Sequence, residues 1–222
     1  MLNVLWDGGS NFPGIAQFGK AFIELATNGD LWRHSIASLF RVTLGFYLAI
    51  LLAVPLGLFL GRRQGWRKWM DPVVQFLRPI SPLAWTPFAM AWFGIGDAPA
   101  LFIIFLAAFF PILISTTEAA ASIHPMYFLV ASNLQLTSWE SLCKIIVPAT
   151  APNILLALRV SLGVAWLVVV AAEMIAVKSG LGYLIIDSRN ALRLDYVMVA
   201  MTTIGMIGLA LDHTIARLGR LE

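Results

Sequence analysis

The sequence predicts an all-α integral membrane protein with about five transmembrane helices. Hydrophobic residues make up 59% of its 222 residues, charged residues make up only 12%, and the mean hydropathy is +0.83. Soluble domains contain about 25% charged residues. Three stretches, at 42–61, 79–96 and 98–117, carry no charge. Because an apolar stretch of roughly 20 residues can cross a bilayer as a helix, the chain has room for about five or six spans.

Residues 1–33 are expected to form an N-terminal periplasmic or interfacial segment. The chain does not start with a basic stretch followed by an apolar core, so the pattern of a signal peptide is missing. Apolar residues then recur at helical spacing, at Ile15, Phe18, Phe22 and Leu25. This spacing is typical of a short amphipathic helix that lies on the membrane surface.

A transmembrane domain is predicted over residues 34–217, followed by a cytoplasmic tail at 218–222. Its spans are expected at 35–60, 72–94, 98–117, 151–177 and 194–215. The second span is unusual because it contains or borders four prolines, Pro72, Pro79, Pro82 and Pro87. Each proline frees a backbone carbonyl that needs a new partner in hydrocarbon. This segment is therefore predicted either to line a pathway or to be a kinked structural helix.

Charge sets the orientation of the spans. Four basic residues follow the first span in one short loop, as in a cytoplasmic loop: Arg62, Arg63, Arg67 and Lys68. Alternation then places residues 118–150 and the tail inside, and Asp97 and residues 178–193 outside. It also places the N-terminus outside, which leaves open whether a further span precedes Met1. In the outer loop, residues 179–190 indicate a turn, a short re-entrant helix and a polar stretch that is either a docking site or an ordinary connection.

Residues 127–148 form a long amphipathic stretch between two apolar blocks. They are compared with a loop pattern that reads Glu-Ala-Ala, then any three residues, Gly, any nine residues, and Ile-x-Leu-Pro. The chain matches this pattern at Ala131, Ile145 and Pro148. Gln135 stands at the glycine position, and Leu129, Val130 and Val147 replace other members of the pattern. The longer segments WRHSIASLFRVTLGFYLAILLAVPLGLFLG, DPVVQFLRPISPLAWTPFAMAWFGIG, LRVSLGVAWLVVVAAEM and SGLGYLIIDSRNALRLDYVMVAMTTIGMIGLALD surround it in order.

On these residues the chain resembles the permease subunits of bacterial ABC importers. It is most similar to the nitrate, sulfonate and taurine branch of the binding-protein-dependent transport inner-membrane components, over about residues 30–215. Members of this branch usually carry one more span before the region where this chain begins. The resemblance implies a type I ABC importer permease in the bacterial inner membrane. It also implies three partners: a second copy of the chain, ABC ATPase subunits, and a periplasmic or lipid-anchored solute-binding protein.

The resemblance further implies that residues 118–148 contain a coupling helix that docks in a groove of the ATPase. Such a helix needs apolar anchors on one face, and a glycine in its bend would permit a positive φ. The expected coupling residues are Ala131, Leu134, Gln135, Leu136, Trp139, Leu142, Ile145 and Pro148. The alternative is a surface helix that packs on the chain's own spans.

Five charged residues lie within or at the ends of the predicted spans: Arg41, Arg78, Arg159, Glu173 and Asp212. Because a charge at the bilayer centre costs about 2.5–3.5 kcal/mol on insertion scales, each should face protein, water or an interface. Arg41 and Asp212 are expected to reach the interface by snorkelling. Glu173 is expected either at an external gate or in an ion pair with another helix. The candidate pathway residues are Arg78, Ser81, Trp85, Arg159 and Glu173, with structural pairing of the charges as the alternative.

The sequence does not support an enzyme. It lacks the P-loop pattern, its three histidines lack metal-ligand spacing, and its single cysteine, Cys143, excludes an internal disulfide and a cysteine metal cluster. No cofactor is expected on this chain, since ATP and magnesium would be held by the ATPase, and nucleic acid is not an expected partner. The predicted function is transport of a small oxyanion of the nitrate, bicarbonate, sulfonate or taurine class by alternating access. The alternatives are a secondary transporter or channel, and a scaffold subunit that binds ATPases without forming the substrate site.

Overall fold

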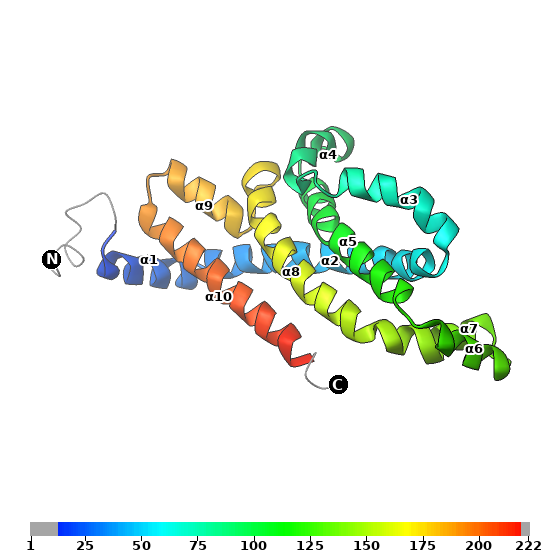
Figure 1. Cartoon of the computed structure of the whole chain (residues 1–222). Helices are drawn as coiled ribbons and strands as arrows, with labels where there is room; N and C mark the ends of the chain where they lie inside the picture. Colours follow the sequence, from blue (N-terminus) through cyan, green and yellow to red (C-terminus); the bar gives the residue numbers. More distant parts are fainter. Residues whose placement is uncertain (1–12, 219–222) are drawn as a thin grey trace, which may run out of the picture. The chain divides into compact units, whose positions relative to one another are not determined.

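The computed structural model of the chain describes residues 13–218, and side chains as far as residue 214 (Figure 1). Residues 1–12 and 219–222, parts of the predicted N-terminal segment and tail, lie outside this description. The described residues form helices joined by short connections. In chain order these are α1 (Ile15–Thr27), α2 (Asp30–Arg62), α3 (Gln64–Leu77), the short 3₁₀ turn η2 (Pro82–Trp85), α4 (Thr86–Phe93), α5 (Asp97–Ala121), α6 (Pro125–Asn133), α7 (Ser138–Ser141), the π-helical turn η3 (Leu142–Ile146), α8 (Val147–Ala176), α9 (Leu181–Asn190) and α10 (Leu194–Leu218).

Four helices within the described residues are long and apolar enough to cross a membrane. They are Asp30–Arg62, Asp97–Ala121, the continuous helix Ser138–Ala176, and Leu194–Thr214. Each exceeds the roughly 20 residues that a 30 Å hydrocarbon core requires. The predicted all-α membrane fold is thereby confirmed, and four of the five expected spans correspond to these helices.

The remaining expected span, 72–94, which is the second in chain order, is not one helix, and this expectation was wrong. α3 ends at Leu77, the η2 turn covers Pro82–Trp85, and α4 begins only at Thr86. Pro79 and Pro82 lack the backbone N–H that would continue the helical hydrogen-bond ladder, so the helix stops and restarts. Pro87 lies in the first turn of α4, where the missing N–H costs nothing.

The boundary expected between the loop and the fourth span is also different in the structure. The helix does not stop at Pro148, because the residues from Ser138 to Ala176 form one continuous helix. The π-helical turn Leu142–Ile146 precedes Pro148, and here the Val147 N–H donates to the Leu142 carbonyl, five residues back. A π turn of this kind adds one residue to the helix without ending it. The loop helix α7 is therefore continuous with α8.

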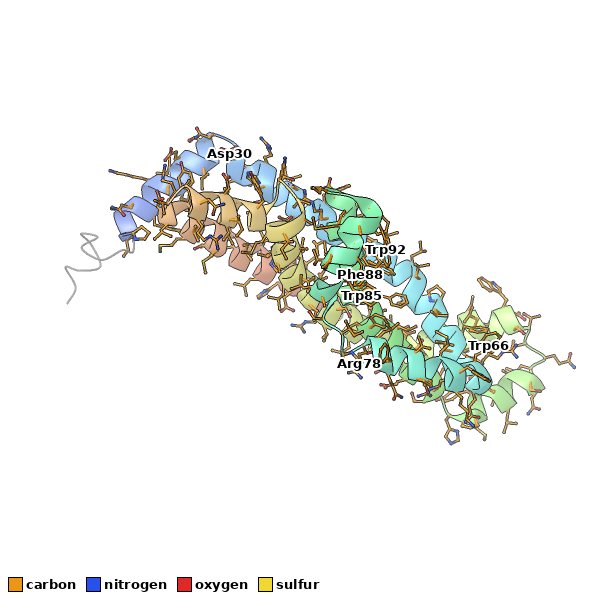
Figure 2. The ribbon with its side chains drawn as sticks, turned by 90° about the horizontal axis from the view of Figure 1, so that it is seen from above. Asp30, Trp66, Arg78, Trp85, Phe88 and Trp92 are labelled. Atoms are coloured by element: carbon orange, nitrogen blue, oxygen red, sulfur yellow. The ribbon has the colours of Figure 1, made fainter. Side chains whose placement is uncertain are left out.

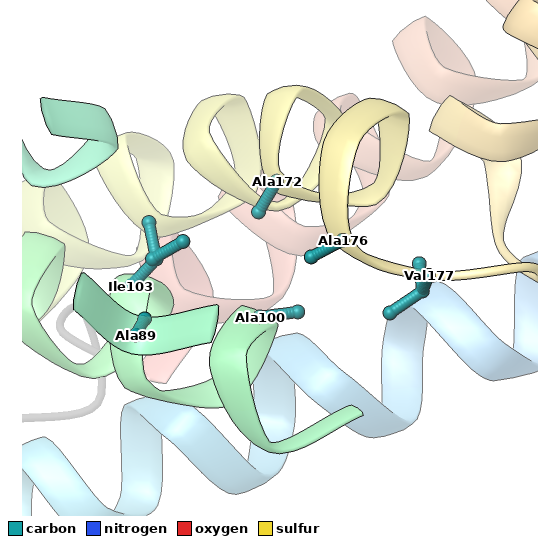
Figure 3. Packing of buried hydrophobic residues seen from close by; sticks show 6 residues of the cluster. All are labelled: Ala89, Ala100, Ile103, Ala172, Ala176 and Val177. Atoms are coloured by element: carbon teal, nitrogen blue, oxygen red, sulfur yellow. The ribbon is translucent and has the colours of Figure 1, made fainter. Parts of the chain in front are cut away.

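The chain divides into two compact units, each with residues from α2, α5, α8 and α10. Unit 1 comprises residues 1–44, 83–104 and 166–211. Its core cluster lies where α4, α5 and α8 meet, and Figure 3 shows its members: Ala89, Ala100, Ile103, Ala172, Ala176 and Val177. Four of the six are alanines, and small residues let membrane helices approach closely. On α4 and the turn before it, Trp85, Phe88 and Trp92 form a row of ring contacts (Figure 2).

Unit 2 comprises residues 45–82, 105–165 and 212–222. In it, α2 packs on α5 through two glycines. A Cβ on Gly57 would lie 2.7 Å from Thr116 Cβ, and one on Gly61 would lie 2.6 Å from the Thr117 carbonyl oxygen. Both are too close for any side chain. Gly57 and Gly61, which are four residues apart, thus both allow the two helices to pack closely, whereas Gly65, four residues further on, faces open space.

Candidate functional site

Two short helices, α6 and α7, occupy the loop between α5 and α8, and both have start signals that the sequence encodes. At α6, His124 Nδ1 accepts a hydrogen bond from the Met126 N–H at 3.2 Å. At α7, Thr137 and Glu140 form a reciprocal capping box, with Thr137 N to Glu140 Oε2 at 2.9 Å and Glu140 N to Thr137 Oγ1 at 3.2 Å. Each cap satisfies backbone donors that a helix start leaves unpaired.

The residues predicted to couple divide into two groups by exposure. Ala131 is buried, and Leu136, Leu142 and Ile145 are half-buried. The others are exposed: Leu134, Gln135, Trp139 and Pro148. Further exposed apolar side chains on α6 enlarge the surface, namely Met126, Tyr127, Leu129 and Val130. Trp139 is 71% exposed, an unusual exposure for the largest apolar side chain. The loop therefore presents an apolar face that no described part of the chain covers.

Gln135 occupies the bend between α6 and α7 with a φ of +51°. The Leu136 N–H donates to the Ala131 carbonyl and the Gln135 N–H donates to the Ser132 carbonyl, each at 3.0 Å. These two bonds form a Schellman motif, in which the residue at the position of Gln135 is usually glycine. The left-handed turn expected of a glycine is thus present although the residue is glutamine.

Gln135→Gly is expected to stabilise this turn by about 1 kcal/mol, because a non-glycine residue in the left-handed region costs about 1–2 kcal/mol. Amide hydrogen exchange at Leu136, whose N–H closes the motif, measures the change. Asn133→Gly is the matched control, since Asn133 is right-handed helix and glycine there is expected to destabilise α6. Faster exchange at Leu136 in Gln135→Gly would contradict the assignment of strain to this residue.

The Arg62 side chain connects the loop to the end of α2. Its guanidinium carbon lies 3.4 Å from the centre of the Phe128 ring on α6. A cation over an aromatic face contributes about 0.5–1 kcal/mol at exposed sites. The position of α6 is therefore tied to the last residue of a membrane-crossing helix, in addition to its direct covalent link to α5.

A groove of about 410 Å³ lies between α5 and α8 in unit 2. It is lined on one side by Pro111, Ser115, Glu118 and Ala119 of α5 with Ser122 just after the helix, and on the other by Asn153, Leu156, Ala157 and Val160 of α8. Four of the nine are polar, and Glu118 is the charged member. This groove was not predicted from the sequence. Its signal was available, because Ser115, Glu118 and Ser122 recur at i, i+3 and i+7 along one face of an otherwise apolar helix.

Arg159 of α8 pairs with Asp212 of α10. Arg159 Nε lies 2.9 Å from Asp212 Oδ1, and Nη2 lies 2.9 Å from Oδ2, so the two groups face each other as a fork. Both side chains are about half exposed. The expected snorkelling of Asp212 is thus replaced by a specific partner on another helix. Such bidentate pairs are stronger and more directional than single hydrogen bonds.

A second ion pair, between Arg41 and Glu173, is buried in unit 1. Arg41 Nη1 lies 2.7 Å from Glu173 Oε1, and the two side chains are 3% and 0% exposed. Snorkelling of Arg41 was therefore the wrong expectation, and Glu173 forms the ion pair with another helix. Arg41 also contacts Asp97 Oδ1 through Nε at 2.8 Å, together with the hydroxyl and carbonyl oxygens of Ser179.

The same cluster satisfies the N-terminal donors of α9. The Gly180 N–H donates to His34 Nδ1 at 3.0 Å, the Leu181 N–H to Ser38 Oγ at 2.9 Å, and the Gly182 N–H to Glu173 Oε2 at 3.0 Å. Gly180 has a φ of +105°, and a Cβ there would overlap the Glu173 carboxylate. Side chains of α2 and α8 thus cap the short helix α9, and the sequence had predicted a short helix here.

The remaining pathway candidates lie on the broken segment. Arg78, labelled in Figure 2, follows α3 as its C-cap and is exposed. Ser81 is exposed as well. Trp85 is half-buried, and its ring centre lies 6.0 Å from that of Phe88. Arg78 therefore remains available for an anion, because no ion pair engages it within the described residues.

A charged cluster lies at the connection between α9 and α10. Arg193 binds Asp195 through Nη2 at 2.9 Å and Glu24 of α1 through Nη2 at 3.3 Å. Hydrogen bonds that Arg193 donates to the Asp195 carboxylate raise the pKa of Arg193 above its ordinary value, so the guanidinium stays charged. In residues 13–214, no group of three or more His, Cys, Asp or Glu side chains could hold a metal ion.

Four long apolar helices, with a helical loop between the second and the third along the chain, have a counterpart among known proteins. The family model described as "Binding-protein-dependent transport system inner membrane component" matches residues 53–220. The chain belongs to this family. It is an ABC importer permease and a multi-pass protein of the inner membrane, as its sequence motifs predicted.

Curated relatives of this permease span most of its length. A putative ABC transporter permease of Methanocaldococcus jannaschii is 43% identical over 86% of this chain and 72% of its own. The taurine transport system permease protein of Escherichia coli K12 is 34% identical over 87% of this chain and 70% of its own. The nitrate import permease protein of Synechococcus elongatus is 36% identical over 88% of this chain and 71% of its own.

A solved structure shows the same fold. An inward-facing form of the MetNI methionine ABC transporter superposes on this permease with a TM-score of 0.72, over 83% of this chain and 92% of that chain. The two sequences are only 14% identical, so the similarity concerns the fold alone. The type I importer permease fold predicted from the sequence is thereby confirmed.

Proposed function

We propose that this permease forms the translocation pathway of an ATP-driven importer, as a pair of identical subunits that alternate between outward-facing and inward-facing states. A periplasmic or lipid-anchored solute-binding protein delivers the solute from outside. Separate ATPase subunits bind ATP and magnesium and hydrolyse the nucleotide. The permease itself holds no cofactor in this scheme.

The observation that carries this proposal is the exposed apolar face of the α6–α7 loop. A partner that covered Trp139 and Leu134 would bury a large apolar area at the point where the chain leaves the membrane. Because α7 continues through the π-helical turn into α8 without a break, movement of the loop would be transmitted directly to the first turns of α8. The proposed coupling residues remain Ala131, Leu134, Gln135, Leu136, Trp139, Leu142, Ile145 and Pro148.

The proposed solute is a small oxyanion of the nitrate, bicarbonate, sulfonate or taurine class. The names of the taurine and nitrate relatives support this class. The proposed pathway residues are Arg78, Ser81, Trp85, Arg159 and Glu173. Arg78 supplies an exposed cation, and the fork between Arg159 and Asp212 uses only Nε and Nη2, which leaves Nη1 for a further acceptor. Glu173 acts indirectly, because its buried carboxylate holds Arg41 and the start of α9.

The coupling assignment is tested by Trp139→Asp. Loss of a central aromatic anchor from an interface costs about 2 kcal/mol or more, so we expect the affinity for the ATPase to fall roughly thirtyfold. The measurement is co-purification of the ATPase with the tagged permease from membranes, together with ATP-dependent uptake in vesicles. Membrane insertion should be unchanged, because the Trp139 side chain is 71% exposed.

Leu192→Asp is the matched control for this experiment. Leu192 is 86% exposed, lies in the connection before α10 and has a φ of +56°, which aspartate tolerates. We expect normal ATPase association in this variant. Undiminished association in Trp139→Asp would remove the coupling role from α7. Uptake that persists after ATP depletion, with the ion gradient intact, would instead indicate a secondary transporter.

A further inference from the structure

α3 carries an apolar stripe that no described part of the chain covers. Trp66, Trp69, Val73 and Phe76 recur at intervals of three and four residues and are all exposed, Trp69 to 82%. None of the 14 residues of α3 is buried. A stripe of this kind on a membrane protein faces either lipid or another protein.

The start of this stripe forms one wall of a groove. Gly65, Trp66 and Trp69 line an open cavity of about 480 Å³. A Cβ at Gly65 would meet no atom within 4 Å, so the glycine keeps this space open. The centre of the Phe59 ring of α2 lies 6.2 Å from that of Trp66, which is labelled in Figure 2, and this contact supports the position of the indole. The groove can therefore accept a narrow apolar chain beside two indole rings.

Four cations lie within three residues of Gly65, Trp66 or Trp69 in the chain, and two of them form no ion pair with a described residue. Arg62 lies over the Phe128 ring, and Arg67 lies 3.8 Å from Asp71. Arg63 and Lys68 are exposed, and neither forms an ion pair with a described residue. Positive charge is thus available next to an apolar, tryptophan-lined cavity.

We infer that this groove is a binding site for one acidic phospholipid. The acyl chain lies against Trp66 and Trp69, and the phosphate lies between Arg63 and Lys68. These residues come within about 10 Å of Arg62, the last residue of a membrane-crossing helix, so they lie at the level of the lipid headgroups. Tryptophan and basic residues both concentrate at this level of a bilayer, and each basic residue near an anionic surface contributes about 1 kcal/mol.

A lipid explains the groove better than a second copy of the chain does. In a symmetric pair the same surface contacts itself, so the stripe of one copy would bring its own basic cluster toward that of the other. Like charges that meet in this way repel, whereas a phosphate neutralises them. Arg62 also contacts Phe128, so an acidic lipid at this site lies directly beside the anchor of the α6–α7 loop.

The site is tested with the full chain in detergent by native mass spectrometry, with phosphatidylglycerol and phosphatidylcholine of identical acyl chains as probes. We expect phosphatidylglycerol to bind at least tenfold more tightly. Arg63→Gln combined with Lys68→Gln should remove most of this preference for phosphatidylglycerol. Trp69→Ala should instead weaken the binding of both lipids. Lys178→Gln combined with Arg189→Gln is the matched control, because both residues are exposed cations far along the chain from the groove, and it should change neither affinity.

Equal binding of the two lipids by the natural chain, or an unchanged preference in the double glutamine variant, would overturn the site. The alternative occupant, a second copy of the chain, is tested by Trp69→Cys in a Cys143→Ser background. This combination leaves one thiol in the chain. A lipid occupant predicts a chain that stays uncrosslinked under oxidation in the membrane. A disulfide-linked pair through position 69 would show that a second copy covers the groove and would overturn the lipid site.

Discussion

Glu173→Gln is expected to lower the free energy of unfolding by about 3–5 kcal/mol, the range found when one partner of a buried ion pair is removed. The substitution keeps the shape of the side chain but leaves the buried Arg41 guanidinium without its closest anion. It also removes an acceptor. The carboxylate accepts from Ser38 Oγ, Arg41 Nη1 and the Gly182 N–H, and a glutamine amide group would point N–H bonds at one of these donors.

The measurement is denaturant unfolding of the purified permease in mixed micelles. Asp97→Asn is the matched control, because Asp97 contacts the same arginine but is 61% exposed. Exposed pairs contribute about 0–1 kcal/mol, so this variant should lose far less stability. The double variant Arg41→Gln with Glu173→Gln should recover part of the loss, since neither side chain is then charged.

The comparison separates a structural role for Glu173 from direct contact with solute. If Glu173 acts by holding Arg41 and the start of α9, uptake and stability should fall together and recover together in the double variant. A Glu173→Gln permease that unfolds like Asp97→Asn but fails to transport would instead place the carboxylate in the pathway. That result would contradict the assignment of Glu173 to a structural cluster.

Gly61→Leu is expected to cost at least 1–3 kcal/mol, the range for an oversized side chain in a packed interior. The first added carbon alone would lie 2.6 Å from both the Thr117 carbonyl oxygen and Ala120 Cβ on α5. Backbone atoms cannot move aside as a flexible side chain can, so α2 and α5 must separate. Because small residues provide much of the packing between membrane helices, this separation should disrupt unit 2.

Gly163→Leu is the control for Gly61→Leu. Gly163 lies in the interior of α8, and a Cβ there meets no atom within 4 Å. Both substitutions raise helix propensity equally, so a difference between them reports packing alone. Thermal unfolding in detergent, followed by loss of the monodisperse peak, should show a lowered transition only for Gly61→Leu. Equal transitions for the two variants would show that α2 and α5 tolerate a wider separation.

Several features of the fold were predicted from the sequence because they depend on local pattern. Apolar stretches between charges located four helices that are long enough to cross a membrane. The loop motif predicted a turn at Gln135, and the structure has that turn although the residue is not glycine. In each case, one helix or one turn carries all the information that the prediction needs.

The sequence by itself determined that this chain is a helical membrane permease, where most of its spans lie, and which loop offers an apolar face. Only the tertiary structure decided that Arg41 pairs with Glu173, that Arg159 pairs with Asp212, and that a groove lies between α5 and α8. Periodicity shows which face of a helix a charge occupies. The partner across from it depends on how distant helices approach each other, and that approach is set by packing among residues far apart in the chain.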